Sequence, residues 1–407
     1  MARPGTISSA GDAEAGLDRS VSAAVSLGGG TVVLAAGGTA GHLFPAQALA
    51  EALKAKGARI VLITDKRGQT YARDFPADQT VLVDAATFAG RGLLGKVGAI
   101  LSILVGITSA WRRLGALRPA IVIGFGGYPS LPAMVGALVR GVPTIIHEQN
   151  VLLGRVNRLI GGRVTAVASA FDGLEGGGAE VANRVVVTGN PVRERVAARR
   201  QDPYRAPAED GPIRLVVFGG SQGARVMGTV VPAALAMLPD RLRARLRVTQ
   251  QCREEDQARV AETYRDAGIE ADLSTFILDM DQRLSSAHLV IARAGASTIT
   301  ELAVVGRPGL LVPLPGAMDD HQTVNAQLLE QAGAAWRIQE PDFTPSALAA
   351  QLTDLFDTPD TLAGAAERAR GLGRHDATDR LVALVTRLAR LPRRAPLAAS
   401  ASPRGAE

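Results

Sequence analysis

The sequence is poor in residues on which several protein classes depend. It has one cysteine, Cys252, so no internal disulfide can form and a reducing compartment is favoured. Aromatic residues make up only 4% of the chain, which argues against a nucleic-acid surface built on base stacking, and no nucleic-acid partner is expected. The uncharged core of the apolar segment 91–118, residues 97–110, is shorter than the ~20 residues that cross a bilayer.

Two nucleotide-binding motifs are also missing. No G-x-x-x-x-G-K-[ST] pattern occurs, which excludes an ATPase of the P-loop class. The dinucleotide fingerprint lacks its first glycine twice, because Ala36 and Phe218 stand in that place. Asp65 nevertheless follows the second expected strand, near the position of the acid that binds a ribose. An NAD-dependent oxidoreductase therefore stays open as an alternative.

The 407 residues are 47% hydrophobic and 21% charged, a composition typical of a globular chain of two or three domains. The net charge of +6 favours anionic partners. Apolar, β-branched runs alternate with helical patterns, which predicts an α/β fold with parallel sheets buried on both faces. The pattern restarts at Ile213, where IRLVVFGGSQGAR repeats the layout of TVVLAAGGTAGH. We expect a disordered leader (1–28), an N-terminal domain (29–191), a linker (192–212), a C-terminal domain (213–376), a final helix packing back on the N-terminal domain (377–391) and a disordered tail (392–407).

A glycine loop, GGTAGH at residues 37–42, lies between the first expected strand and a helix whose first turn contains Pro45. Unpaired N–H groups and the helix dipole make such a helix start a binding site for phosphate. The alternative is that the glycines only allow the helix and strand to pack closely.

A second helix start, at residues 293–301 (RAGASTITE), carries groups that fit a nucleotide. Ser297 and Thr298 offer hydroxyls and N–H groups to a diphosphate, and Glu301 can accept hydrogen bonds from ribose hydroxyls. Alternatively, Thr298 and Glu301 form a capping box. Further on, Asp320, His321, Gln322 and Asn325 follow a strand, and the amides and carboxylates among them fit a sugar, whereas no sugar contact is assigned to His321.

Two short acidic patterns resemble metal ligands, at residues 279–281 (DMD) and 319–321 (DDH). Both are common by chance. Because a helix start can neutralise a diphosphate, we expect no metal and no other cofactor.

Seven motifs occur in order along the chain: GGTAGH (37–42), GFGGYPS (124–130), HEQN (147–150), TGNPVR (188–193), GGSQGAR (219–225), RAGASTITE (293–301) and DDHQTVNA (319–326). Together they resemble the MurG family, the bacterial glycosyltransferases of family 28 that add N-acetylglucosamine to lipid I, forming lipid II for peptidoglycan synthesis. The resemblance extends from about residue 31 to residue 391. It implies a GT-B fold, with two Rossmann-like, doubly wound parallel-sheet domains facing across a cleft. It also implies an inverting, metal-independent transfer from UDP-N-acetylglucosamine to the C4 hydroxyl of the MurNAc unit of lipid I.

The same resemblance implies roles for individual residues. The donor is expected to contact Thr39, Ala40, Gly41 and Asn150 from the N-terminal half, and Arg193, Ser221, Ile277, Ala296, Ser297, Thr298, Ile299, Thr300, Glu301, Gln322 and Asn325 from the remainder of the chain. The acceptor diphosphate is expected at Gly38, Gly41, His42, Gly126, Gly127 and Tyr128. Ala40 departs from the family, whose usual loop is GGTGGH.

Two residues are candidates for the base that takes the proton of the acceptor hydroxyl. His42 lies in the first glycine loop, and the ordinary pKa of histidine suits proton transfer near neutrality. Glu148 follows a strand and is the other candidate. Alternatively, His42 caps its helix or binds the acceptor diphosphate, and Glu148 is a buried carboxylate that orients His147 or a loop.

The segment 91–118 has five basic residues and no acidic one. It is expected to lie on an anionic membrane surface, with Leu101, Leu104 and Trp111 near acyl chains and Arg112 and Arg113 near headgroups, unless it is a core helix with basic ends. We therefore expect a peripheral enzyme on the cytoplasmic face of the bacterial inner membrane. Transfer to another lipid such as diacylglycerol, and a non-catalytic nucleotide-sugar-binding module, remain alternatives.

Overall fold

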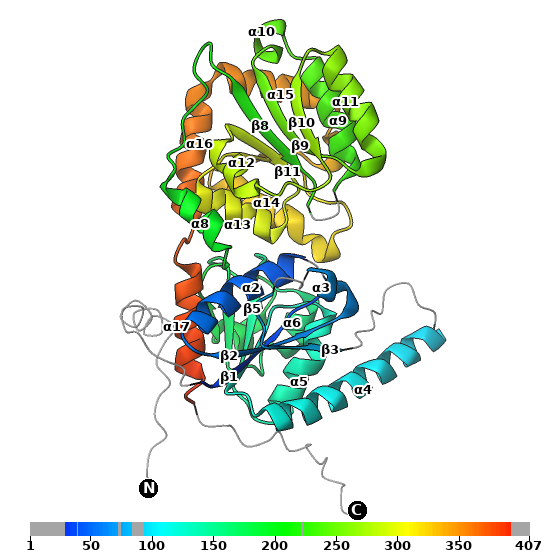
Figure 1. Cartoon of the computed structure of the whole chain (residues 1–407), viewed down its shortest axis with the longest axis vertical. Helices are drawn as coiled ribbons and strands as arrows, with labels where there is room; N and C mark the ends of the chain where they lie inside the picture. Colours follow the sequence, from blue (N-terminus) through cyan, green and yellow to red (C-terminus); the bar gives the residue numbers. More distant parts are fainter. Residues whose placement is uncertain (1–28, 39, 72–74, 84–92, 221–222, 392–407) are drawn as a thin grey trace, which may run out of the picture. The chain divides into compact units, whose positions relative to one another are not determined.

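The computed structural model describes residues 29–38, 40–71, 75–83, 93–220 and 223–391 (Figure 1). The chain divides into two compact units. Among the described residues, the first unit consists mainly of residues 29–149, 153–191 and 378–391, and the second of residues 150–152 and 192–377. The predicted leader and tail lie outside the described residues.

The first unit contains one parallel sheet in the order β3-β2-β1-β4-β5-β6-β7. Its strands are β1 (Thr31–Ala35), β2 (Arg59–Thr64), β3 (Gln79–Leu82), β4 (Ile121–Gly124), β5 (Thr144–Glu148), β6 (Ala166–Ser169) and β7 (Val185–Val187). Alternate residues of β1 enter different cores, since Val32 and Leu34 lie in one cluster and Val33 in another. The sheet is therefore buried on both faces, as the apolar runs predict.

Helices cover both faces of this sheet. Its connecting helices are α2 (Ala40–Ala55), α3 (Lys66–Tyr71), α4 (Leu93–Leu117), η1 (Tyr128–Ser130), α5 (Leu131–Val139), α6 (Arg155–Ile160) and α7 (Gly178–Ala182). One core includes Leu43 and Leu49 of α2, and the other includes Met134 of α5 and Ile160 of α6.

The final helix, α17 (Ala377–Leu388), belongs to the first unit although it follows the second in sequence. Leu381, Leu384 and Val385 are fully buried in the core that also holds Val32 and Leu34 of β1. Figure 1 shows this helix in red beside the strands of the first unit.

The second unit repeats the plan with a six-stranded parallel sheet in the order β10-β9-β8-β11-β12-β13. Its strands are β8 (Ile213–Phe218), β9 (Leu246–Gln251), β10 (Glu270–Ser274), β11 (Leu289–Ala292), β12 (Gly309–Leu311) and β13 (Ala335–Arg337). Its helices are α8 (Glu194–Ala198), η2 (Arg199–Gln201), α9 (Arg225–Ala236), α10 (Asp240–Arg243), η3 (Glu254–Asp256), α11 (Gln257–Asp266), α12 (Met280–Ser286), α13 (Ala296–Val305), η4 (Met318–Asp320), α14 (His321–Gln331), η5 (Glu340–Asp342), α15 (Pro345–Asp357) and α16 (Pro359–Leu372). Both strand orders place the first strand of each unit centrally, as in doubly wound folds, which confirms the expectation of two Rossmann-like α/β halves.

Helix α2 begins earlier than the sequence indicates. Pro45 was expected in its first turn, but the helix starts at Ala40 and Pro45 lies inside it. Before the helix, Gly38 adopts a φ of 82°, a left-handed conformation that favours glycine. Ala40 takes part in the helix, a conformation in which alanine is favoured over glycine.

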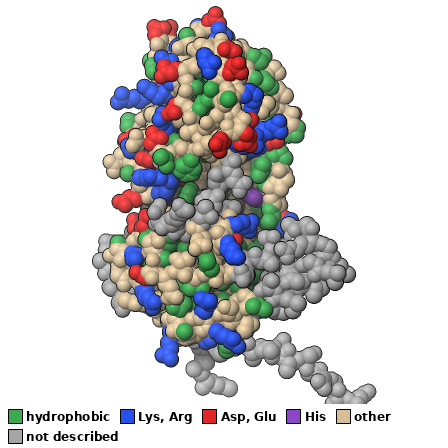
Figure 2. All heavy atoms as spheres, turned by 45° about the vertical axis from the view of Figure 1, so that its right-hand side comes forward, with side chains coloured by type: hydrophobic (Ala, Val, Ile, Leu, Met, Phe, Trp, Pro, Cys, Tyr) green, Lys and Arg blue, Asp and Glu red, His purple; other side chains and the backbone are tan. Residues whose placement is uncertain are grey.

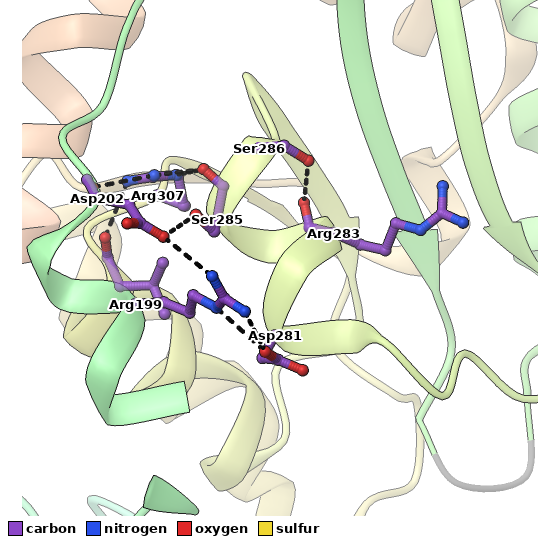
Figure 3. Close-up of polar contacts among 8 residues, drawn as sticks. Arg199, Asp202, Asp281, Arg283, Ser285, Ser286 and Arg307 are labelled. Atoms are coloured by element: carbon purple, nitrogen blue, oxygen red, sulfur yellow. Dashed lines mark hydrogen bonds and ion pairs between the residues drawn. The ribbon is translucent and has the colours of Figure 1, made fainter. Parts of the chain in front are cut away.

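The segment expected to be a linker is instead part of the second unit. Figure 3 shows why: Arg199 places two guanidinium nitrogens 3.1 Å from an oxygen of Asp281, and Ser285 donates to Asp202 at 2.5 Å. Arg307 donates to the carbonyl oxygens of Ser285 and Asp202, at 3.0 and 3.2 Å. Arg199 and Asp202 thus bind this segment to α12, and the carbonyl of Asp202 also binds Arg307 in the turn after α13.

Candidate functional site

The first glycine loop is held by a buried carboxylate at the end of β2. Oδ1 of Asp65 accepts the N–H groups of Gly38 and Gly68, both at 2.9 Å. A Cβ at Gly37 would come within 2.8 Å of both Asp65 and Pro129, so only glycine fits there. The position that sequence reasoning compared with a ribose-binding acid therefore shapes the loop.

His42 lies in the first turn of α2 and packs against the glycine turn after β4. A Cβ at Gly126 would lie 3.3 Å from Cε1 of His42, and one at Gly127 would lie 3.4 Å from Cδ2. Both glycines also have positive φ, 88° and 74°, so a side chain is disfavoured there by the backbone conformation as well as by the close approach of His42. Tyr128 follows at the start of η1. The structure thus brings His42, Gly126 and Gly127 together, as predicted for an acceptor site, with Gly41 and Tyr128 as chain neighbours.

Glu148, the second candidate base, is only 2% exposed at the end of β5. Its Oε2 accepts the N–H of Gly154 at 2.9 Å and the side-chain amide of Asn157 at 2.8 Å. These bonds tie the loop after β5 to the start of α6. The contacts correspond to the alternative in which Glu148 orients a loop.

The predicted anion site lies at the start of α13. Its N-cap is Gly295, and no side chain caps the helix. The hydroxyl oxygen of Ser297 is buried without a hydrogen-bond partner, whereas Thr300 bonds back to the carbonyl of Ala296 at 2.8 Å. Ile299 is fully buried, so any contact it makes with a ligand comes from its backbone.

Glu301 forms an ion pair and no capping box. Its Oε1 lies 3.3 Å from Nη2 of Arg193, and both side chains are largely buried. Burial raises the pKa of Glu301, while the charge and hydrogen bond of Arg193 oppose that rise. Arg193 and Glu301, both expected at the nucleotide, are thus paired with each other.

The two residues predicted to contact the sugar differ in how many hydrogen bonds their side chains already make within the protein. Asn325 is fully buried; its amide nitrogen donates to Asn150 and to the carbonyl of Ala294, and its oxygen accepts the N–H of Val151, all at 3.1 Å. Gln322 is half-buried, and its oxygen accepts the N–H of Leu314 at 3.0 Å.

The loop before α14 has an uncommon backbone. Asp319 and Asp320 both have left-handed φ values, 54° and 52°, directly before the helix. His321 bonds through Nδ1 to the carbonyl of Met318 at 2.7 Å. Among the described residues, no group of three or more His, Cys, Asp or Glu side chains could hold a metal ion.

Ile277 is buried between two exposed apolar residues, Phe276 (52%) and Leu278 (76%), in the segment between β10 and α12. The nearby acidic pattern at 279–281 is paired with arginines. Asp279 contacts Arg283 at 2.8 Å, and Asp281 contacts Arg199 (Figure 3).

Comparison with known proteins covers nearly the whole described chain. Residues 32–169 match the glycosyltransferase family 28 N-terminal domain, and residues 214–381 match the glycosyltransferase family 28 C-terminal domain. The chain belongs to glycosyltransferase family 28. A relative from Paramagnetospirillum magneticum, a UDP-N-acetylglucosamine--N-acetylmuramyl-(pentapeptide) pyrophosphoryl-undecaprenol N-acetylglucosamine transferase, is 49% identical over 88% of this chain and 96% of its own. A relative of the same name from a Methylobacterium species is 48% identical over 88% of this chain and 96% of its own.

Solved structures agree with this family assignment. The crystal structure of MurG from Acinetobacter baumannii has a TM-score of 0.72 and 31% identity, covering 88% of this chain and 99% of that one. The calicheamicin glycosyltransferase CalG4 matches with a TM-score of 0.61 at 14% identity, over 87% of this chain and 95% of its own, which shows a shared fold. The predicted GT-B class and family are confirmed, and the oxidoreductase alternative is not favoured.

In this family 28 chain, several expected site residues cannot be placed. Thr39 and Ser221 lie outside the described residues, as do the side chains of Ala40, Leu101 and Leu104. The described part of α4 exposes Arg112 and Arg113. Trp111 is 40% exposed, and the guanidinium carbon of Arg140 lies 4.2 Å from the centre of its ring. None of the described helices is both long and apolar enough to span a bilayer.

Sequence reasoning did not assign a role to Gln149, the third residue of the HEQN motif. Its Oε1 lies 3.1 Å from Nδ1 of His42, and its Nε2 lies 3.0 Å from Nδ1 of His147. The only signal in the sequence was its place between two candidate residues in one motif.

Proposed function

We propose that this protein transfers N-acetylglucosamine from UDP-N-acetylglucosamine to the C4 hydroxyl of the MurNAc unit of lipid I, with inversion, forming lipid II. The observation that supports this most strongly is the 48–49% identity to transferases named for this reaction, over 88% of the chain. The two family 28 models also span both glycine loops and the start of α13.

The donor belongs to the second unit in this proposal. The backbone N–H groups at the start of α13 and the unpaired hydroxyl of Ser297 bind the diphosphate, where the helix dipole favours negative charge. Glu301, oriented by Arg193, accepts hydrogen bonds from the hydroxyls of the ribose. The backbone of Ile277 contacts the uracil. Gln322 contacts the sugar, whereas the occupied polar atoms of Asn325 give that residue a supporting role.

The acceptor belongs to the first unit. Its diphosphate lies at the N–H group of Gly41 and at the Gly126–Gly127 turn, and its hydroxyl loses a proton to His42. Gly38, also expected at the diphosphate, instead donates its N–H to Asp65 and shapes the loop. His42 is favoured over Glu148 because Glu148 is buried and its Oε2 already accepts two hydrogen bonds, whereas His42 is only half-buried beside the glycine turn.

No metal is required in this proposal, because α13 stabilises the departing diphosphate and both carboxylates of the 279–281 pattern are paired with arginines. Transfer is expected to continue at an unchanged rate in excess EDTA. A loss of activity that Mg²⁺ or Mn²⁺ restores would contradict this part of the proposal.

We further propose that the first unit binds an anionic membrane surface on the cytoplasmic side, where a lipid-linked acceptor is presented. Basic residues outnumber acidic ones in the first unit and the reverse holds for residues 192–377. On the face that Figure 2 shows, few acidic side chains appear in the lower part, whereas both signs mix in the upper part. Arg112→Glu/Arg113→Glu should weaken binding to phosphatidylglycerol vesicles. The control Arg205→Glu/Arg265→Glu, with the same change of charge at exposed residues of the second unit, should not.

The proposed reaction is tested by UDP release with three acceptors. We expect release with a soluble lipid I analogue and none with diacylglycerol or without acceptor. Release with diacylglycerol alone would favour the other lipid transferase, and stabilisation by UDP-N-acetylglucosamine without any release would favour a binding module. Thermal stabilisation by NAD and not by the nucleotide sugar would contradict the proposal.

A further inference from the structure

A chain of polar contacts connects His42 to the interior of the first unit. Nδ1 of His42 lies 3.1 Å from Oε1 of Gln149, and Nε2 of Gln149 lies 3.0 Å from Nδ1 of His147. Nε2 of His147 in turn lies 3.1 Å from the carbonyl oxygen of Gly189. This series of contacts thus connects α2, the residue after β5 and the loop after β7.

The contacts of His147, at the buried end of this series, allow only one placement of its imidazole hydrogen. The carbonyl of Gly189 can only accept a hydrogen bond, so Nε2 of His147 carries a hydrogen. His147 is completely buried, and its pKa is lowered to about 4. Burial is the main cause; the hydrogen bond to Gly189 raises the pKa, and the nearby charge of His42 lowers it. His147 is therefore neutral near pH 7, and its Nδ1 has a lone pair that accepts a hydrogen bond.

The amide of Gln149 is oriented by three acceptors. Its Nε2 lies 3.0 Å from the lone pair nitrogen of His147, 3.0 Å from the carbonyl of the same residue and 3.1 Å from the carbonyl of Phe125. An amide turned by 180° would place its oxygen against these three acceptors and lose the bonds that its nitrogen makes to them. The amide oxygen consequently faces His42.

We infer that Gln149 is a positioning residue that holds His42 in the tautomer with hydrogen on Nδ1, leaving Nε2 as the atom that accepts the acceptor's proton. Because the oxygen of Gln149 can only accept, Nδ1 of His42 must donate to it. Neutral imidazole carries one hydrogen, so the lone pair lies on Nε2. The tautomer follows from the contacts alone, while the role of Nε2 rests on the proposed function.

The balanced step is a single displacement. The O–H bond of the acceptor hydroxyl breaks and its proton passes to Nε2 of His42, while the oxygen forms a bond to the anomeric carbon of N-acetylglucosamine. The bond from that carbon to the diphosphate breaks, and its electron pair leaves with UDP. His42 becomes an imidazolium whose Nδ1–H still donates to Gln149, so the same contact stabilises the charged product form.

The tautomer can be measured without substrate. The chain has five histidines, so uniform ¹⁵N labelling of histidine gives five imidazole spin systems, and loss of one set in His42→Ala identifies His42. Two-bond ¹⁵N–¹H correlations above pH 7 are expected to show hydrogen on Nδ1 for His42 and on Nε2 for His147. A neutral His42 with hydrogen on Nε2 in the unaltered protein would overturn the inference, even if every variant failed to fold.

The consequence for catalysis is tested with Gln149→Met, which keeps the length of the side chain and removes its polar atoms. We expect His42 to change to hydrogen on Nε2 and kcat to fall roughly 10- to 100-fold, with the KM values for donor and acceptor within about twofold. Gln47→Met is the control, because the half-buried Gln47 of α2 bonds only to the exposed Glu51 among the contacts described; it should change neither the spectrum nor kcat. An unchanged kcat in Gln149→Met, or a rise in KM alone, would refute the positioning role.

The two proposals fail in different ways. If no acceptor supports transfer but the spectrum shows Nδ1–H at His42, the proposed function is wrong and the tautomer assignment stands. If lipid I supports transfer but His42 carries hydrogen on Nε2, the proposed function stands and the role of Gln149 is wrong.

Discussion

Replacing Asn325 by alanine separates a structural role from a sugar contact. The fully buried side chain makes three hydrogen bonds, to the N–H of Val151, the carbonyl of Ala294 and the side chain of Asn150. Val151 and Ala294 are themselves buried, so alanine leaves two buried backbone groups without this partner. At about 1–3 kcal/mol for each unpaired group, the second unit should lose about 3 kcal/mol of its free energy of unfolding.

A loss of this size is measurable by calorimetry. For a unit of this size, about 3 kcal/mol lowers the unfolding temperature by roughly 6–12 °C. Gln322→Ala is the control, because Gln322 is half-buried with one bond to the N–H of Leu314, and its unfolding temperature should fall by less than about 4 °C. If Asn325→Ala unfolded at the temperature of the unaltered protein and only raised the KM for the donor, the structural reasoning would be refuted and the sugar contact restored.

Two further predictions concern the first unit. Leu384→Ala removes a fully buried side chain of α17 from the core around β1 and should destabilise that unit by roughly 2–5 kcal/mol; an unchanged urea midpoint would show that α17 does not contribute to that core. His147 has a pKa of about 4 when folded and 6.5 as its ordinary value, so the unfolded chain binds more protons between these values and the stabilisation present above pH 6.5 is lost as the pH falls towards 4. In His147→Gln the urea midpoint should vary less over this window, and an equal pH dependence in both proteins would contradict the assignment of a neutral, buried imidazole.

The sheets were readily predicted from the sequence because their strands are continuous apolar runs. The runs at Thr31–Ala35 and Ile213–Phe218, each followed by a glycine loop, also identify the restart of the fold. In the first unit, the strands β3 and β6 were not identified in advance. β3 is short and largely exposed, and β6 (AVAS) is short and rich in alanine, so neither forms a distinctive β-branched run.

Features that depend on distant partners could not be predicted in this way. The arginines of residues 192–212 suggest a linker until their partners, such as Asp281 for Arg199, are known. Likewise, Thr298 and Glu301 have capping-box spacing, but Glu301 contacts Arg193, more than a hundred residues away in sequence. Gln149 gains its role only when β5, α2 and the loop after β7 come together.

The central claim is tested most directly by the product that the full chain forms from UDP-N-acetylglucosamine and a soluble lipid I analogue. The account predicts a disaccharide with a β linkage to the C4 hydroxyl of MurNAc, one UDP released for each disaccharide, and loss of this product in His42→Ala while the donor still stabilises the variant. An α-linked product, release of UDP by hydrolysis without disaccharide, or full turnover by His42→Ala would contradict the account.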